Sequence, residues 1–152
     1  MLDAVAAGKH VLCEKAIALN AAEAAEMFPA AADAGVLLME AMWMRFCPFI
    51  ATLDELIADG AIVAGRNGRL RVHAPFHHSP AITLERRGDV VATYDTSFAG
   101  HGFRFEIADA ERCVAAGLTE SLLRPAADTL AVMEWMDAIR RRVGVVFRGE
   151  AE

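Results

Sequence analysis

The chain has 152 residues, of which 55% are hydrophobic and 24% charged, with a net charge of −6. This much apolar material excludes intrinsic disorder and suffices for a compact domain. The acidic balance argues against nucleic acid and against an anionic membrane surface as partners.

The first third of the sequence alternates short apolar runs with helical patterns. Asn20 and Glu23 have the spacing of a capping box, Gly35 suits a helix end, and Pro29 is expected to kink the helix between them. In chain order, the predicted elements are a helix end at 5–8, a strand at 9–14, a helix at 21–34, a strand at 36–39 and a helix at 49–59. This β-α-β order predicts a parallel strand pair with a crossover helix.

The rest of the chain changes character. Short strands rich in β-branched residues are predicted at 62–63, 70–72, 82–84 and 90–94, and helices at 103–116 and 125–143. Arg87-Gly88-Asp89 predicts a hairpin between the last two strands. The fold class is therefore α/β (α+β), in which a β-α-β element joins a small, mainly antiparallel sheet covered by helices.

The predicted core consists of the apolar residues that recur on one face of these elements. They are Val11, Leu12, Leu37, Leu38, Leu53, Leu56, Ile62, Leu70, Val72, Ile107, Leu130, Val132, Met133 and Ile139.

Three cysteines, Cys13, Cys47 and Cys113, are far apart and form no Cys-x-x-Cys pair, which is typical of reduced thiols in a cytoplasmic protein. No apolar run is long enough for a membrane span, and the N-terminus lacks the pattern of a secretory signal. We therefore expect a cytoplasmic protein without a membrane partner.

Glu14 and Lys15 follow the first predicted strand directly. Ligands of open α/β sheets bind outside the carboxyl ends of the strands, where a lysine can exchange a proton with an alcohol or a carbonyl. By residue type alone, an exposed ion pair is the commoner explanation of a Glu-Lys dipeptide.

Other site chemistries have weaker support. The sequence contains neither a Gly-x-Ser-x-Gly nor a His-Glu-x-x-His motif. His73, His77 and His78 surround a proline-containing turn without accompanying carboxylates, so solvent-exposed turn histidines are favoured over a metal site. Residues 100–105 read Gly-His-Gly-Phe-Arg-Phe, in which Phe105 stands where a phosphate loop needs its third glycine. We predict no metal.

Four stretches carry a resemblance to a known family. They are AGKHVLCEKAIALNAAEAAEM (7–27), GVLLMEAMWMRFCP (35–48), AGHGFRFEIADAERCVAAGLTESLLRP (99–125) and DTLAVMEWMDAIRRRVGVVF (128–147). Together, and in this order, they closely resemble the Gfo/Idh/MocA oxidoreductases, and the last stretch looks closest to the dihydrodiol dehydrogenase-like branch.

The resemblance implies roles for four residues. Lys15 corresponds to the catalytic acid/base of the family's Glu-Lys-Pro motif, Glu14 lies beside the cofactor, and Trp43 and Arg45 lie near the nicotinamide. The cofactor implied is NAD or NADP. Ala16 replaces the motif's proline, which leaves the turn less constrained. Without the resemblance, Trp43 would be interpreted as a core aromatic and Arg45 as a surface cation.

The resemblance also implies how the chain is organised. Residues 1–45 correspond to a remnant of the dinucleotide-binding domain, and 46–152 to a shortened C-terminal domain for substrate and oligomerisation. We expect an N-terminal truncation that removes the glycine-rich loop, and an internal loss near residues 60–61 that removes the segment carrying the family's catalytic histidine.

The implied function is hydride transfer between NAD(P) and a hydroxyl or carbonyl carbon of a sugar, cyclitol or dihydrodiol. Because of the missing segments, whether the chain is an enzyme stays open, and we expect weak activity or none from the isolated chain. The expected partners are a small-molecule substrate and further copies in a homo-oligomer. The alternative is a non-catalytic remnant that acts as a sheet-mediated interaction module.

Overall fold

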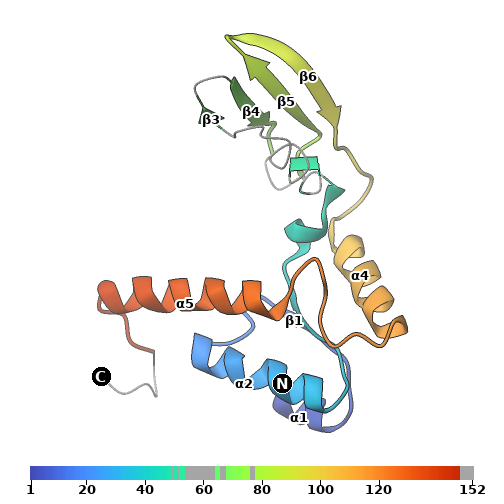
Figure 1. Ribbon diagram of the computed structural model, residues 1–152, viewed down its shortest axis with the longest axis vertical. Helices are drawn as coiled ribbons and strands as arrows, with labels where there is room; N and C mark the ends of the chain where they lie inside the picture. The colour runs from blue at the N-terminus through green and yellow to red at the C-terminus, as the bar shows by residue number, and fades with distance from the viewer. Residues whose placement is uncertain (49, 51, 54–63, 66–67, 76–77, 148–152) are drawn as a thin grey trace. The chain divides into compact units, whose positions relative to one another are not determined.

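The chain forms two compact units (Figure 1). The computed structural model describes residues 1–48, 50, 52–53, 64–65, 68–75 and 78–147. Unit 1 comprises Met1–Met42 and Glu106–Glu152, and unit 2 comprises Trp43–Phe105. These units are defined by spatial contacts, whereas the division into 1–45 and 46–152 rests on resemblance and stays a prediction.

Unit 1 is built around a parallel strand pair. Its elements are α1 (Leu2–Ala6), β1 (Val11–Glu14), α2 (Ala21–Asp33), β2 (Leu38–Ala41), most of α4 (Phe103–Ala115) and α5 (Ala126–Arg142). β1 and β2 run parallel with Val11 opposite Leu38 and Glu14 opposite Ala41. The predicted β-α-β element is therefore confirmed, and α5 lies alongside its crossover helix α2 (Figure 1).

Local sequence signals set the ends of α2. Asn20 Oδ1 accepts a hydrogen bond from the Glu23 amide at 2.9 Å, and Gly35 follows the helix with a φ of +67°. β2 begins two residues later than predicted. The reason is that the Val36 amide still bonds back to Ala31 of α2, so pairing with β1 starts only at Leu38.

The core of unit 1 matches the prediction in part. Its fully buried members are Val5, Ile17, Ala24, Ala31, Val36, Leu38 and Met133. The prediction is wrong for Leu12, Ile107, Val132 and Ile139, which are exposed. Leu12 and Ile107 line one open pocket, and Ile139 lines another beside α5. These three side chains are therefore not covered by any described element.

Unit 2 contains an antiparallel sheet. Its elements are the 3₁₀ helix η1 (Trp43–Phe46), β3 (Ala64–Gly65), β4 (Gly68–Val72), β5 (Ala81–Arg86) and β6 (Asp89–Asp95), with strand order β3-β4-β5-β6. The predicted hairpin is confirmed. Its two turn residues, Arg87 and Gly88, have φ of 54° and 95°, the positive values that match the twist of paired strands. Cys47, Leu70 and Ile82 form the buried centre of the unit.

Some predicted elements lie outside the described residues. These are the strand at 62–63, most of the helix at 49–59, and the expected internal loss near 60–61. The predicted α/β fold class is confirmed by the mixed α/β fold that the structure shows.

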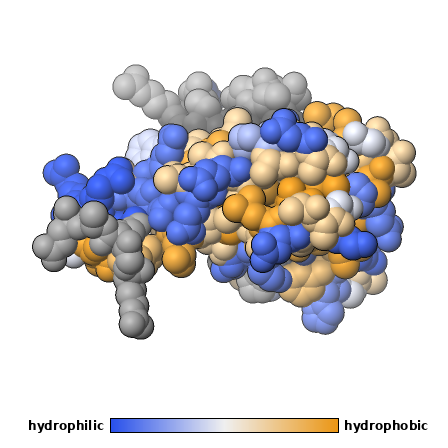
Figure 2. All heavy atoms as spheres, turned by 90° about the horizontal axis from the view of Figure 1, so that it is seen from below, coloured by the Kyte–Doolittle hydropathy of each residue, from blue (hydrophilic) through white to orange (hydrophobic). Residues whose placement is uncertain are grey.

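The surface mixes apolar and polar side chains (Figure 2). Apolar residues reach solvent along α5, where Trp135 is 73% exposed. Within the described part of the chain, none of the helices is long and apolar enough to cross a lipid bilayer.

Candidate active site

Glu14 and Lys15 stand at the carboxyl end of β1. Glu14 is the last residue of the strand and pairs with Ala41, the last residue of β2, so both strands end at one edge of the parallel pair. Both side chains are exposed. No ion pair joins Glu14 to Lys15 among the described contacts.

The turn that follows Lys15 is held from inside the unit. The Lys15–Ala16 peptide bond is cis. The Ile17 amide donates to Glu40 Oε1 at 3.2 Å, and Ile17 and Glu40 are both buried. Glu40 was not predicted as a site residue, although an acidic residue inside the apolar run Val36–Ala41 is a signal that sequence reasoning could have used.

A second unpredicted carboxyl group lies near the same edge. Glu106 of α4 is only 4% exposed, and its Oε2 atom has no hydrogen-bond partner among the described residues. Burial, and then the negative charge of Glu14, raise the pKa of Glu106. A buried carboxyl with a raised pKa therefore lies close enough to sense the charge of Glu14.

The cysteine beside this edge is not activated. Cys13 of β1 is free, and burial followed by the charge of Glu40 raises the pKa of its thiol. A raised thiol pKa keeps the protonated, unreactive form at neutral pH. Cys13 is therefore not set up as a nucleophile.

Trp43 and Arg45 belong to unit 2. Both lie on η1 and are half-buried. The Trp43 ring centroid is 5.6 Å from that of Phe103, and a Cβ atom on Gly102 would collide with the Trp43 ring. Gly102 is thus required for close packing on the indole, which fixes the ring within this unit. Glu14 and Lys15 belong to unit 1, whereas Trp43 and Arg45 belong to unit 2. A common site for the four residues stays a prediction.

Histidine side chains of unit 2 have protein partners. His73 Nε2 lies 2.6 Å from Thr83 Oγ1, and the His78 ring stacks on Phe98 with centroids 4.2 Å apart. His77 lies outside the described residues. Among the residues that are described, no group of three or more histidine, cysteine, aspartate or glutamate side chains is arranged to hold a metal ion.

A dinucleotide requires a helix N-terminus for its pyrophosphate as well as a place for its nicotinamide. The N-terminus of α2 is already neutralised, because the Ala21 amide donates to Asp137 Oδ2 at 2.9 Å and the Leu19 amide to Glu23 Oε2 at 3.2 Å. At α5 the Ala126 amide donates to a carboxylate too, that of Glu120, at 2.8 Å. These two helix N-termini therefore do not suit a pyrophosphate.

Sequence comparisons place the N-terminal segment in a family. Residues 1–42 match the model GFO_IDH_MocA, described as an oxidoreductase family with an NAD-binding Rossmann fold. Trans-1,2-dihydrobenzene-1,2-diol dehydrogenase of Mus musculus is 43% identical over 83 residues, which are 55% of this chain and 25% of the relative. The Oryctolagus cuniculus enzyme is 48% identical over 68 residues, which are 45% of this chain and 19% of the relative. The matches thus span a quarter or less of the length of these curated relatives.

Solved structures share the fold. A 3-ketoreductase from Actinomadura kijaniata, in complex with TDP-benzene and NADP, has a TM-score of 0.73 at 17% identity, covering 91% of this chain and 72% of that one. An aldose-aldose oxidoreductase from Caulobacter crescentus, complexed with glycerol, has a TM-score of 0.71 at 16% identity, covering 94% and 73%. The structural likeness supports the fold, and the sequence matches support the dihydrodiol dehydrogenase-like branch. Residues 1–42 thus match the Gfo/Idh/MocA oxidoreductase family, and the whole chain shares its fold with these solved structures.

Proposed function

We propose that this chain carries the nicotinamide-facing part of an NAD(P)-dependent oxidoreductase active site. The observation that carries the proposal is the place of Lys15, exposed directly after the carboxyl end of a parallel strand, in the segment that matches the family model. The substrate is a small hydroxyl- or carbonyl-bearing molecule such as a sugar, cyclitol or dihydrodiol. This class follows from the diol in the names of the curated relatives and the sugar-directed names of the structural neighbours.

Lys15 performs the proton transfer. The bound cofactor supplies or accepts the hydride at its nicotinamide ring. During carbonyl reduction, the Lys15 ammonium gives a proton to the substrate oxygen as that oxygen becomes a hydroxyl. During alcohol oxidation, the neutral Lys15 amine takes the hydroxyl proton. Its exposure at the strand end leaves Nζ accessible to a substrate.

Three further residues border the nicotinamide in this proposal. Glu14 is adjacent to Lys15 at the strand end. Trp43 and Arg45 share one turn of η1, and the Trp43 ring is held by its contacts with Gly102 and Phe103. A ring fixed in this way offers a flat apolar wall, and a nearby guanidinium offers donors to a carboxamide oxygen.

Turnover by the isolated chain is expected to be weak or absent. Asp137 and Glu120 already occupy the amides at the N-termini of α2 and α5, where a phosphate would otherwise bind. A cofactor would therefore be held mainly through its nicotinamide end.

Thermal melts of the full chain with and without excess NADH or NADPH test the proposal. A ligand at about a hundred times its Kd raises the free energy of unfolding by about 2.7 kcal/mol. We expect an upward shift with one of the two, reduced in Arg45→Ala. Any oxidation of trans-1,2-dihydrobenzene-1,2-diol should fall about 100-fold in Lys15→Ala. Lys9→Ala is the matched control, because Lys9 is the only other lysine. Cooperative melting without any shift would contradict the proposal.

A non-catalytic interaction module is the second candidate, and α5 favours it. Trp135, Met136 and Val143 are exposed on or just after this helix, and exposed apolar patches mark association surfaces. Light scattering on the same samples separates the candidates. A defined oligomer that shows no cofactor shift would support the module, and the expected sheet-mediated homo-oligomer stays a prediction.

A further inference from the structure

Glu40 is a buried charge inside an apolar strand. It lies in the middle of β2, is 4% exposed, and its strand neighbours Met39 and Ala41 are buried as well. An isolated buried carboxylate is strongly disfavoured, so its two oxygens need compensation. Oε1 accepts from the Ile17 amide, which lies two residues after Lys15. Glu40 is thus the side chain that anchors the turn carrying Lys15.

The other oxygen of Glu40 is held by two residues from the C-terminal part of the chain. Arg124 Nη2 lies 2.6 Å from Oε2, and Thr129 Oγ1 of α5 donates to the same atom at 3.1 Å. Arg124 and Thr129 are both buried. Arg124 Nε has no hydrogen-bond partner among the described residues, so Glu40 is the anion that fixes this guanidinium.

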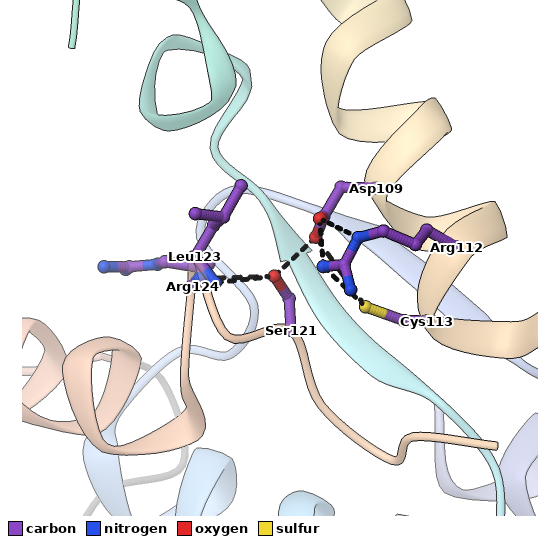
Figure 3. Close-up of polar contacts among 6 residues, drawn as sticks. All are labelled: Asp109, Arg112, Cys113, Ser121, Leu123 and Arg124. Atoms are coloured by element: carbon purple, nitrogen blue, oxygen red, sulfur yellow. Dashed lines mark hydrogen bonds and ion pairs between the residues drawn. The ribbon is translucent and has the colours of Figure 1, made fainter. Parts of the chain in front are cut away.

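Arg124 is itself positioned by a buried hydroxyl (Figure 3). Ser121 Oγ accepts from the backbone amides of Leu123 and Arg124, at 3.1 and 3.3 Å. The same hydroxyl donates to Asp109 Oδ2 at 2.5 Å, and Arg112 pairs with the other oxygen of Asp109. A continuous series of contacts therefore runs from α4 through the 121–124 turn to Glu40.

Stability alone does not account for a buried Glu40–Arg124 ion pair. Buried ion pairs are often replaced by apolar residues without loss of stability, because desolvation offsets the attraction between the charges. The distinctive result of this pair is geometric. Glu40 can hold the Ile17 amide in one place only while Arg124 and Thr129 hold Glu40.

We propose that Glu40, held by Arg124 and Thr129, is a positioning residue that fixes the turn from which Lys15 acts. The chemical role of Lys15 rests on the proposed function, but the restraint on the turn does not. Loss of the Glu40 anchor leaves the Ile17 amide without its acceptor. The backbone from Lys15 to Ile17 then moves, while the rest of unit 1 keeps its structure.

Backbone ¹⁵N relaxation on the full chain tests the restraint. Order parameters are about 0.85 for rigid backbone and below about 0.6 for flexible backbone. We expect rigid values at Lys15 and Ile17 in the wild type. We expect flexible values in Glu40→Gln, which forms no ion pair with Arg124 and has one acceptor oxygen where Glu40 uses two. The control is Glu111→Gln, which removes an exposed charge from α4 and should leave both residues rigid.

A second variant keeps the test decisive if Glu40→Gln unfolds. Glu40→Met with Arg124→Met replaces the buried pair by apolar side chains and is expected to fold. In it, Lys15 and Ile17 should be flexible although the melting temperature stays near that of the wild type. Rigid values at both residues in this double variant would overturn the proposal.

Failure of the positioning role of Glu40 can be distinguished from failure of the proposed function. Where turnover is measurable, Glu40→Gln should lower kcat about 10-fold or more with a smaller change in KM, since the restraint acts on the orientation of Lys15. Flexible order parameters in Glu40→Gln, together with turnover that Lys15→Ala leaves unchanged, would contradict the role of Lys15 and leave the positioning effect established. Unchanged order parameters with Lys15-dependent turnover would contradict only the positioning effect.

Discussion

The contacts inside unit 1 and those inside unit 2 differ in how far apart their residues lie in the sequence. In unit 1, the polar contacts join residues far apart in sequence. Ala21 bonds to Asp137 across 116 positions, and Arg124 to Glu40 across 84. In unit 2, each strand pairs with its neighbour in the chain, and the Arg69–Glu85 pair spans 16 positions. Unit 1 therefore depends on specific remote side chains, and unit 2 on local pairing and an apolar centre.

The ion pairs of unit 2 contribute little to its stability. Arg69 and Arg71 of β4 both approach Glu85 of β5, and the hydrogen bond from Arg69 lowers the pKa of Glu85. The two arginine side chains are 59% and 54% exposed, so solvent screens both pairs. The stability of unit 2 should accordingly follow its apolar core and vary little with pH.

The largest expected effect comes from that core. Ile82→Ala removes a fully buried side chain from the cluster with Cys47 and Leu70, and such truncations cost about 2–5 kcal/mol. In a Trp135→Phe background, Trp43 is the remaining tryptophan, so its fluorescence during denaturant unfolding reports on unit 2. The helical signal in circular dichroism reports mainly on unit 1. We expect the fluorescence transition to move and the helical transition to stay.

The control for this variant is Val91→Ala on β6. Val91 is exposed, so its truncation should change the free energy of unfolding by less than about 0.5 kcal/mol. Equal movement of both transitions in Ile82→Ala would mean that the two units unfold together, and the comparison between them would fail.

The same contrast explains which elements the sequence predicts well. Asn20 and Glu23 define the start of α2 through contacts three residues apart, and Arg87-Gly88 defines the hairpin through backbone conformation. The Glu-Lys signal at the end of β1 is likewise local, and the structure exposes both side chains there. Such features depend on residues close together in the sequence, so they can be predicted without knowledge of the fold.

Features that depend on tertiary neighbours were missed. Ile107 and Ile139 fit the apolar period of their helices, but no described element covers them. Arg124 and Glu106 look like ordinary charges in the sequence, and Glu40 differs only by the apolar run around it, yet all three are buried in the structure. Part of their environment comes from remote segments: Arg124 lies 84 positions from Glu40, and Glu14 raises the pKa of Glu106.

A smaller effect is expected where α5 meets α2. Asp137 accepts from the Ala21 amide at 2.9 Å and from Arg140 at 3.0 Å, and these contacts lower its pKa, the amide contact most. Asp137→Asn weakens both, and we expect a loss of about 1 kcal/mol at pH 7. Because the folded pKa is the lower one, this stabilisation is present above about pH 4 and is lost as the pH falls through the folded pKa.

Urea unfolding at pH 7 and at pH 3 measures that loss. The difference between Asp137→Asn and the wild type should shrink at the lower pH. Glu134→Gln, an exposed change on the same helix, serves as the control and should be nearly neutral at both. A difference that stays constant with pH would show that the charge of Asp137 contributes nothing.

The smallest effect has the opposite sign and comes from the same unit. The pKa of Glu106 is raised by burial and then by Glu14, so its contribution is fully present below about pH 4 and is lost as the pH rises through the folded pKa. Glu106→Gln removes the ionisation, and the melting temperature should rise by a few degrees at pH 8 with no change at pH 4. Glu111→Gln on the exposed side of α4 should show neither change. A lower melting temperature for Glu106→Gln at pH 8 would mean that the ionised carboxylate is stabilised. If the signs hold, unit 1 contains two carboxyl groups whose pKa values are shifted in opposite directions, so their contributions to stability change oppositely with pH. The stability of unit 2 is expected to vary little over the same range.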